Sequence, residues 1–209
     1  MENMSVKQPI KNVVGIDLGI KHFLSDGNGK QIKNPHYLKK TFYYLRRRQK
    51  RLSKTKKYSK NRAKQHIKIA QLHEKITNQR NDFLHKLSRC YINNYDLVAI
   101  EDLNIKGMIR NHYLSQYISD VAWHKFIQML SYKAESADKT VVKVNPRGTS
   151  KIHKYGKLDR DYNAPLNILK RGLKKVGMGQ TEFTPVDTEA LQKLYIVSAN
   201  SVVESGSIE

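Results

Sequence analysis

Two short apolar runs in this sequence each contain a carboxylate, which is an unusual residue in a strand. Asp17 interrupts the β-branched run of residues 13–20, and Glu101 ends a second apolar run. Such runs are typical of buried strands, where a carboxylate must be paired, hydrogen-bonded or bound to a metal. Asp161 is a third acid, placed just before an apolar helical stretch. The alternative for Asp17 alone is that it caps a turn before Gly19.

The chemistry open to three such acids depends on whether they converge. Three carboxylates at one edge of a sheet repel one another unless cations neutralise them, and oxygen-only ligands suit Mg²⁺ or Mn²⁺. Two such ions roughly 4 Å apart can activate a water and stabilise the leaving oxygen in phosphodiester cleavage. We therefore predict that Asp17, Glu101 and Asp161 form a two-metal catalytic site with water as the nucleophile.

The elements that would position these acids follow from hydrophobic spacing. An Asp-Gly-Asn-Gly turn signal at residues 26–29 separates two short apolar runs, which predicts an antiparallel meander of three strands. Further strands are expected at residues 97–100 and 141–144, and Ser119 or Asp120 is expected to cap the helix between them. The apolar stripe of that helix is Trp123, Phe126, Ile127, Leu130, Ala134 and Ala137.

This order of strands and helices, ending in a helix that opens at Asp161, is that of the ribonuclease-H-like fold. In that α/β fold, the first two acids lie on neighbouring central strands of a mixed sheet, and the third faces them from a flanking helix. The predicted order therefore agrees with the predicted metal site.

A strongly basic segment interrupts the pattern after the meander. Residues 27–73 contain no Asp or Glu, whereas Lys39 to Lys68 carries fourteen Lys and Arg. Apolar spacing over residues 38–52 and 69–87 predicts two long helices, so residues 36–95 form a helical hairpin insertion. A solvated helix face is the alternative, but such faces usually mix charges. The candidate nucleic-acid-binding residues are Arg46, Arg47, Arg48, Lys50, Arg51, Lys54, Lys56, Lys57, Lys60, Arg62, Lys64 and, outside the hairpin, Arg147.

Length and charge bound the protein class. The 209 residues include 39 Lys and Arg against 18 Asp and Glu, a net charge of +21 that favours a nucleic-acid partner. No apolar stretch approaches the roughly 18 to 20 residues of a spanning helix, so we expect no membrane partner and a cytoplasmic protein. A single cysteine, Cys90, excludes an internal disulfide. We expect a lead-in over residues 1–11, one domain over 12–175 and a disordered tail over 176–209.

A different class of protein shares part of the first motif. Residues 15–19, Gly-Ile-Asp-Leu-Gly, also resemble the first phosphate loop of actin-like ATPases and sugar kinases. Those proteins need a second phosphate loop and a glycine-rich adenosine site, neither of which follows residue 100. They also need two domains of this fold, for which 209 residues are too few. The nuclease interpretation is therefore favoured.

Six stretches of the sequence form a specific combination: VGIDLGIK (14–21), LHEKI (72–76), NQRNDFLHK (78–86), IEDLNIKGM (100–108), VNPRGTS (144–150) and LDRDYNA (158–164). Over residues 12–172 this combination resembles the C-terminal, RuvC-like half of TnpB (OrfB-type) proteins of insertion sequences, relatives of type V CRISPR effectors. The resemblance implies an RNA-guided DNA endonuclease associated with transposition, with DNA and guide RNA as partners. It also implies that Asp17, Glu101 and Asp161 are the catalytic acids, with Asp102 and Asp159 as near misses.

The sequence departs from the family pattern in two places. Family members carry a four-cysteine zinc ribbon before the last acid, whereas the corresponding remnant, residues 149–160, has no cysteine, so we expect no zinc. Family members also have an N-terminal half that grips guide RNA and target DNA. Two hypotheses therefore stay open: a metal-dependent nuclease domain, or a non-catalytic nucleic-acid-binding fragment or decayed copy. Retention of all three acids favours the nuclease.

Overall fold

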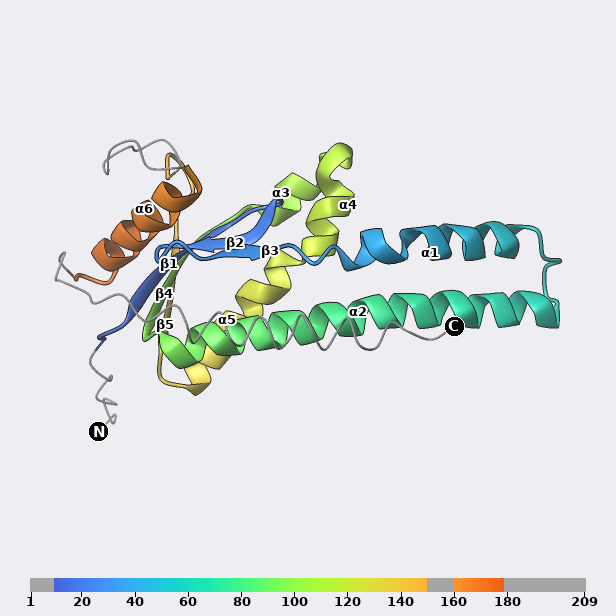
Figure 1. Cartoon of the computed structure of the whole chain (residues 1–209), viewed down its shortest axis with the longest axis horizontal. Coiled ribbons are helices and arrows are strands. Elements are labelled where there is room, and N and C mark those ends of the chain that lie inside the picture. The colour runs from blue at the N-terminus through green and yellow to red at the C-terminus, as the bar shows by residue number, and fades with distance from the viewer. Residues whose placement is uncertain (1–9, 150–159, 179–209) are drawn as a thin grey trace.

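A five-stranded mixed sheet lies at the centre of the computed structural model, which describes residues 10–149 and 160–178 (Figure 1). The strand order is β3-β2-β1-β4-β5. β1 pairs antiparallel with β2 and parallel with β4, and β5 extends the parallel part. The predicted three-strand meander is confirmed. The strands are β1 (Val13–Leu18), β2 (His22–Asp26), β3 (Gln31–Lys33), β4 (Leu97–Glu101) and β5 (Thr140–Val144).

Helices cover both faces of this sheet. α6 lies on one face, whereas α5 and the C-terminal part of α2 lie on the other (Figure 1). α1 and α2 lie side by side as a helical hairpin that projects away from the sheet, as the apolar spacing predicts. The helices are α1 (Tyr37–Ser53), α2 (Lys60–Asn94), α3 (Ile105–Ile109), α4 (His112–Val121), α5 (Trp123–Ser136) and α6 (Arg160–Lys175).

The alternation of side chains along the strands separates two apolar clusters. Val14 and Ile16 of β1 point into the larger cluster, with Trp123 and Phe126 of α5. Val13 belongs to the smaller cluster beneath α6. Because successive strand residues face opposite sides, Gly15 and Asp17 share the α6 side with Val13.

The predicted cap of α5 is wrong. Ser119 and Asp120 lie inside α4, and α5 begins after Ala122, which has a left-handed backbone with φ 56°. The Asp120 carboxylate instead accepts hydrogen bonds from the Leu38 backbone N–H at 3.2 Å and from Arg80 Nη2 at 2.8 Å. It therefore ties the start of α1 to α2, a long-range role that local spacing does not reveal.

α6 lies unusually close to the sheet. A Cβ added at Gly15 would come within 2.0 Å of the Pro165 carbonyl oxygen and 2.8 Å of the Leu169 nitrogen. A Cβ added at Gly172 of α6 would come within 2.5 Å of the Ala99 Cβ on β4. The two glycines let helix and sheet backbones approach, which fixes α6 beside the strand that carries Asp17.

Several predictions fall outside the described ranges. The predicted zinc-ribbon remnant lies almost entirely within residues 150–159, and most of the lead-in and tail lies in residues 1–9 and 179–209. Among the helices of the part that the structure describes, none combines the length and the apolar character of a membrane span.

Candidate active site and nucleic-acid interface

Two of the three candidate acids lie on adjacent parallel strands. β1 and β4 pair in the register Gly15↔Ala99 and Ile16↔Ile100. One step further along the same register, Asp17 stands opposite Glu101, on the α6 side of the sheet. Neighbouring strands are about 4.8 Å apart, so these two residue positions are neighbours near the carboxyl ends of the strands.

Glu101 occupies a buried and polar environment. Its side chain is only 7% exposed, and Oε1 accepts a short hydrogen bond from the Thr149 hydroxyl. Burial raises the pKa of Glu101, although the Thr149 hydrogen bond and the nearby positive charge of Arg171 lower it in part. The pKa of this carboxyl therefore lies above its ordinary value, because burial outweighs these two favourable interactions.

α6 is oriented so that its first turn points toward this edge of the sheet. Three of its side chains, at four-residue spacing, donate hydrogen bonds to main-chain oxygens of β5 and the turn that follows. These bonds run from Asn167 to Thr149 (2.9 Å), from Arg171 to Asn145 (2.7 Å) and from Lys175 to Lys143 (2.9 Å). As the donors advance along α6 from Asn167 to Lys175, their acceptors move back from Thr149 to Lys143. The helix therefore runs antiparallel to β5.

Asp161 lies in the first turn of α6. Because α6 is antiparallel to the parallel strands, this turn belongs to the end of the helix nearest the carboxyl edge of β1 and β4. The Asp161 side chain lies outside the part of the structure that is described. Among the side chains that are described, no three His, Cys, Asp or Glu residues gather as a metal site would require.

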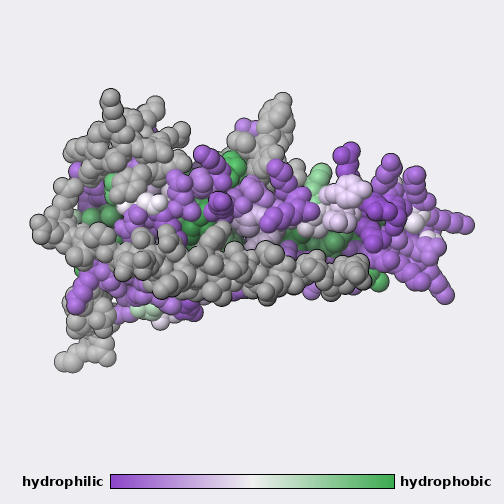
Figure 2. Space-filling model, in the orientation of Figure 1, coloured by the Kyte–Doolittle hydropathy of each residue, from purple (hydrophilic) through white to green (hydrophobic). Residues whose placement is uncertain are grey.

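The candidate nucleic-acid-binding residues lie mainly on the free part of the hairpin, where hydrophilic residues crowd the surface (Figure 2). Two of the predicted cations are half-buried rather than exposed, namely Arg48 and Arg62. Arg62 Nη1 donates to the Leu52 carbonyl at 3.2 Å, so this side chain caps the end of α1. Among the described residues, the hairpin cations between Lys39 and Lys68 form no ion pairs.

Arg147, the candidate outside the hairpin, is exposed in the turn after β5. Its backbone carbonyl accepts a hydrogen bond from Arg171 at 2.8 Å. Thr149, two residues later, contacts Glu101. Arg147 therefore lies on the same turn that supports the acidic edge.

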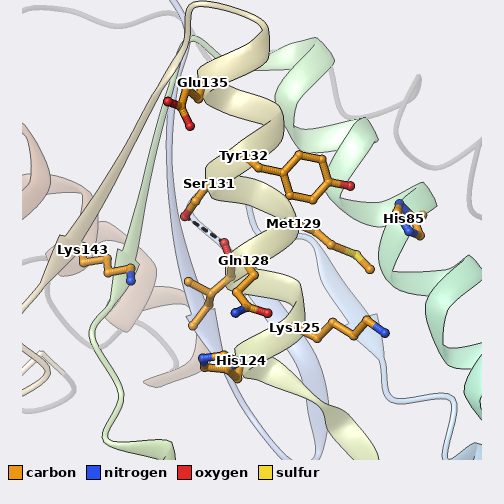
Figure 3. Close-up of a pocket in the computed structure, with 10 residues that line it drawn as sticks. His85, His124, Lys125, Gln128, Met129, Ser131, Tyr132, Glu135 and Lys143 are labelled. Carbon is orange, nitrogen blue, oxygen red and sulfur yellow. Dashed lines mark hydrogen bonds between the residues drawn. The ribbon is translucent and has the colours of Figure 1, made fainter.

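A surface hollow of about 700 Å³ lies along α5, away from the two acids. His85 on α2 and Lys143 on β5 lie on opposite sides of α5 in this view (Figure 3). The polar groups are thus spread around the helix instead of converging on one point. The pKa of His85 is lowered by partial burial and by the positive charges of Lys133 and Lys125. This hollow contains none of the predicted acids.

Sequence reasoning missed the residues that support Glu101. Thr149 lies in the stretch VNPRGTS, but nothing in the local sequence says that its hydroxyl reaches β4. Asn167 and Arg171 could have been found from the sequence by one feature. They are polar residues at four-residue spacing on an otherwise apolar helix face, which indicates a polar contact. Their partners are set by tertiary packing.

Comparison with known proteins identifies the family. Residues 1–112 match the family OrfB_IS605, described as “Probable transposase”. The chain belongs to this family. Within it, this TnpB-like chain also matches the Cas12f1-like TNB domain over residues 123–157. The resemblance stated from the sequence motifs is confirmed.

Two relatives show how much of a family member this TnpB-like chain represents. A Streptomyces pristinaespiralis protein named “Putative RNA-guided DNA endonuclease” is 35% identical over 182 residues, covering 77% of this chain and 45% of the relative. Escherichia coli K12 InsQ, which carries the same name, is 29% identical over 157 residues, covering 68% and 39%. The chain thus spans less than half the length of these relatives.

One solved structure shares the fold. It is the protein in the cryo-EM structure of the Cas12f1-sgRNA-target DNA complex, with a TM-score of 0.51 and 21% sequence identity. The match covers 79% of this chain and 51% of that chain. At this identity the likeness concerns the fold alone, a mixed sheet with flanking helices.

Proposed function

We propose that this TnpB-like chain is a DNA-binding, metal-dependent DNA endonuclease domain with a ribonuclease-H-like (RuvC-like) fold. Asp17, Glu101 and Asp161 would hold two Mg²⁺ or Mn²⁺ ions for phosphodiester hydrolysis. The observation that supports the proposal is the register of β1 and β4, which pairs Ile16 with Ile100 and, continued by one residue, would align Asp17 with Glu101. Family membership supports the same activity, since two relatives are named as RNA-guided DNA endonucleases.

The donor set fits a hard divalent cation. All three candidate ligands are carboxylates, and the neighbouring Thr149 adds another oxygen, which matches the preference of Mg²⁺ and Mn²⁺ for oxygen ligands. The raised pKa of Glu101 also fits, because a buried carboxylate gains most from a nearby cation. When bound, two such ions would supply an activated water and stabilise the leaving oxygen of the phosphodiester.

The protein's own residues would hold this donor set in place. The Thr149 hydroxyl fixes the orientation of the Glu101 carboxylate by donating to Oε1. Asn167 donates to the Thr149 carbonyl at 2.9 Å, and Arg171 donates to the Asn145 carbonyl at 2.7 Å. α6 therefore both carries Asp161 and braces the turn that supports Glu101, so ligand position depends on one helix.

The basic hairpin would supply affinity for the substrate. Cations without ion-pair partners in the described structure are free to bind phosphates, and the release of condensed counterions then drives binding. DNA is the proposed substrate, and guide RNA is the proposed second partner by analogy with the named relatives. A non-catalytic nucleic-acid-binding protein would use this hairpin in the same way but would not cleave.

Cleavage by matched acid variants tests the proposal. Asp17→Asn should abolish Mg²⁺- or Mn²⁺-dependent cleavage of single-stranded DNA while leaving DNA affinity nearly unchanged, since one acid contributes no phosphate contact. Asp102→Asn is the control, because Asp102 is an exposed acid adjacent to Glu101 in sequence. It should keep wild-type cleavage.

Two results would contradict the nuclease proposal. One is cleavage by Asp17→Asn at the wild-type rate, which would assign any activity to another site or a contaminant. The other is tight DNA binding by the wild-type chain with no metal-dependent cleavage of any strand. That outcome would favour the non-catalytic, nucleic-acid-binding alternative.

A further inference from the structure

α1 exposes aromatic side chains that its own packing does not use. Phe42, Tyr43 and Tyr44 are 42%, 68% and 60% exposed, whereas Leu45 is the residue that α1 buries. The Tyr43 and Tyr44 rings contact each other, with centroids 5.6 Å apart and planes at 79°. In this arrangement the ring whose edge points at its neighbour keeps both faces free of that neighbour.

The charged residues that neighbour this tyrosine pair on α1 are all positive. Residues three and four positions away on a helix are surface neighbours. For Tyr43 and Tyr44 these positions hold one threonine, Thr41, and otherwise only cations. The cations are Lys39, Lys40, Arg46, Arg47 and Arg48. No acid lies between Gly27 and His73 in the sequence.

We propose that the Tyr43–Tyr44 pair is a stacking platform for unpaired nucleobases of a single strand whose phosphates bind the flanking cations. The exposed aromatic rings are the reason to propose a single strand instead of a duplex as the ligand. Bases within a duplex already stack on one another, whereas every unpaired base offers a π-face to an exposed ring. Cations alone account for phosphate binding but give the rings no role. The inference extends the proposed nucleic-acid-binding function by naming the form of substrate that this part of α1 takes.

Three probes separate base stacking from phosphate binding. They are a labelled oligothymidylate of about 20 nucleotides, longer than the roughly 4 to 16 nucleotides of common single-strand sites, an abasic strand of the same length, and a duplex of the same length. Binding is measured by fluorescence anisotropy in EDTA, so that no cleavage occurs. The full chain is used throughout.

The variants are chosen to keep the fold and the charge. Tyr43→Ala with Tyr44→Ala removes both rings from an exposed surface, and Tyr43→Phe with Tyr44→Phe keeps the rings without their hydroxyls. Tyr132→Ala is the matched control, because Tyr132 is a 47% exposed tyrosine on α5. Far-UV circular dichroism confirms that helix content is unchanged.

The double alanine variant should bind oligothymidylate roughly 5- to 150-fold more weakly, the range expected when one base loses its stacking partner. Its affinity for the abasic strand and the duplex should change less than about two-fold, because its cations are intact. The double phenylalanine variant and Tyr132→Ala should match the wild type on all three probes.

Equal weakening on the abasic strand and oligothymidylate would overturn the proposal, because the rings would then act through charge or helix structure. Unchanged binding to oligothymidylate would also overturn it and would leave the pair as a contact for another protein segment. Neither result affects the endonuclease proposal, because binding in EDTA does not depend on the three acids. Cleavage that is lost in Asp17→Asn would still support that proposal.

Discussion

The closest contact between α6 and the sheet gives the most quantitative prediction. Gly15→Ala would place a Cβ 2.0 Å from the Pro165 carbonyl oxygen, so helix and strand must separate by about 1.4 Å to reach the 3.4 Å of an ordinary contact. Both colliding partners are backbone, which cannot rotate away as a side chain can. We expect overpacking to cost about 3 kcal/mol, the upper part of the range for core insertions.

The measurement is thermal or urea unfolding of the full chain, followed by far-UV circular dichroism. A loss of about 3 kcal/mol corresponds to a melting temperature lowered by roughly 6 to 12 °C for a chain of this size. Gly27→Ala is the matched control: its Cβ would meet Leu166 of the same helix at an ordinary 3.5 Å. Gly27→Ala should therefore stay within about 0.5 kcal/mol of the wild type. Equal stability of the two variants would refute the claim that α6 lies directly on Gly15.

Three further predictions address the acids, the hairpin and the core. Burial raises the pKa of Glu101 above its ordinary 4.5 in the folded state. At pH values between the unfolded and the folded pKa, the folded state therefore binds more protons than the unfolded state, so the free energy of unfolding falls as pH rises through this interval. Glu101→Gln should abolish cleavage and lack this fall, so in EDTA its melting temperature relative to the wild type should increase from pH 4 to pH 8; a decrease would contradict the assignment. Tyr91→Phe should cost about 1 to 3 kcal/mol in urea unfolding, since it removes the 2.9 Å hydrogen bond to the fully buried Asp26 carboxylate; a neutral result would mean that another donor replaces the hydroxyl. Five glutamine replacements in α1 should flatten the salt dependence of duplex DNA binding by several units of slope, at roughly 0.9 per phosphate contact, and an unchanged slope would mean that the hairpin is only a solvated face. The five positions are Arg46, Arg47, Arg48, Lys50 and Arg51.

The strands, both hairpin helices and the positions of two acids were predictable because they depend on local pattern. Short, continuous apolar runs mark β1 and β4, so Asp17 and Glu101 could be recognised as carboxylates in strands. Their pairing across the sheet, in contrast, follows from a register that only the assembled fold determines. The sequence suggested that β1 and β4 are neighbours only because its predicted order of strands and helices is that of the ribonuclease-H-like fold.

The environment of Glu101 was not predictable, because it depends on contacts between distant segments. Thr149 reaches Glu101 across 48 residues, and Asn167 reaches Thr149 across 18. Asp120 was misjudged for the same reason: its partner Arg80 lies 40 residues away. Short polar residues near a helix start are typical caps, but tertiary ion pairing overrode that preference here. α3 and α4 were not among the helices predicted from the sequence.

Anomalous diffraction from a crystal of the full chain soaked in Mn²⁺ tests the central claim most directly. The proposed site predicts manganese peaks within about 2.3 Å of carboxylate oxygens from Asp17, Glu101 and Asp161, at the normal distance for a hard cation. It also predicts loss of the peaks in Asp161→Asn crystals soaked in the same way. Manganese that binds elsewhere, with Asp17 and Glu101 ligating none, would contradict the proposed active site.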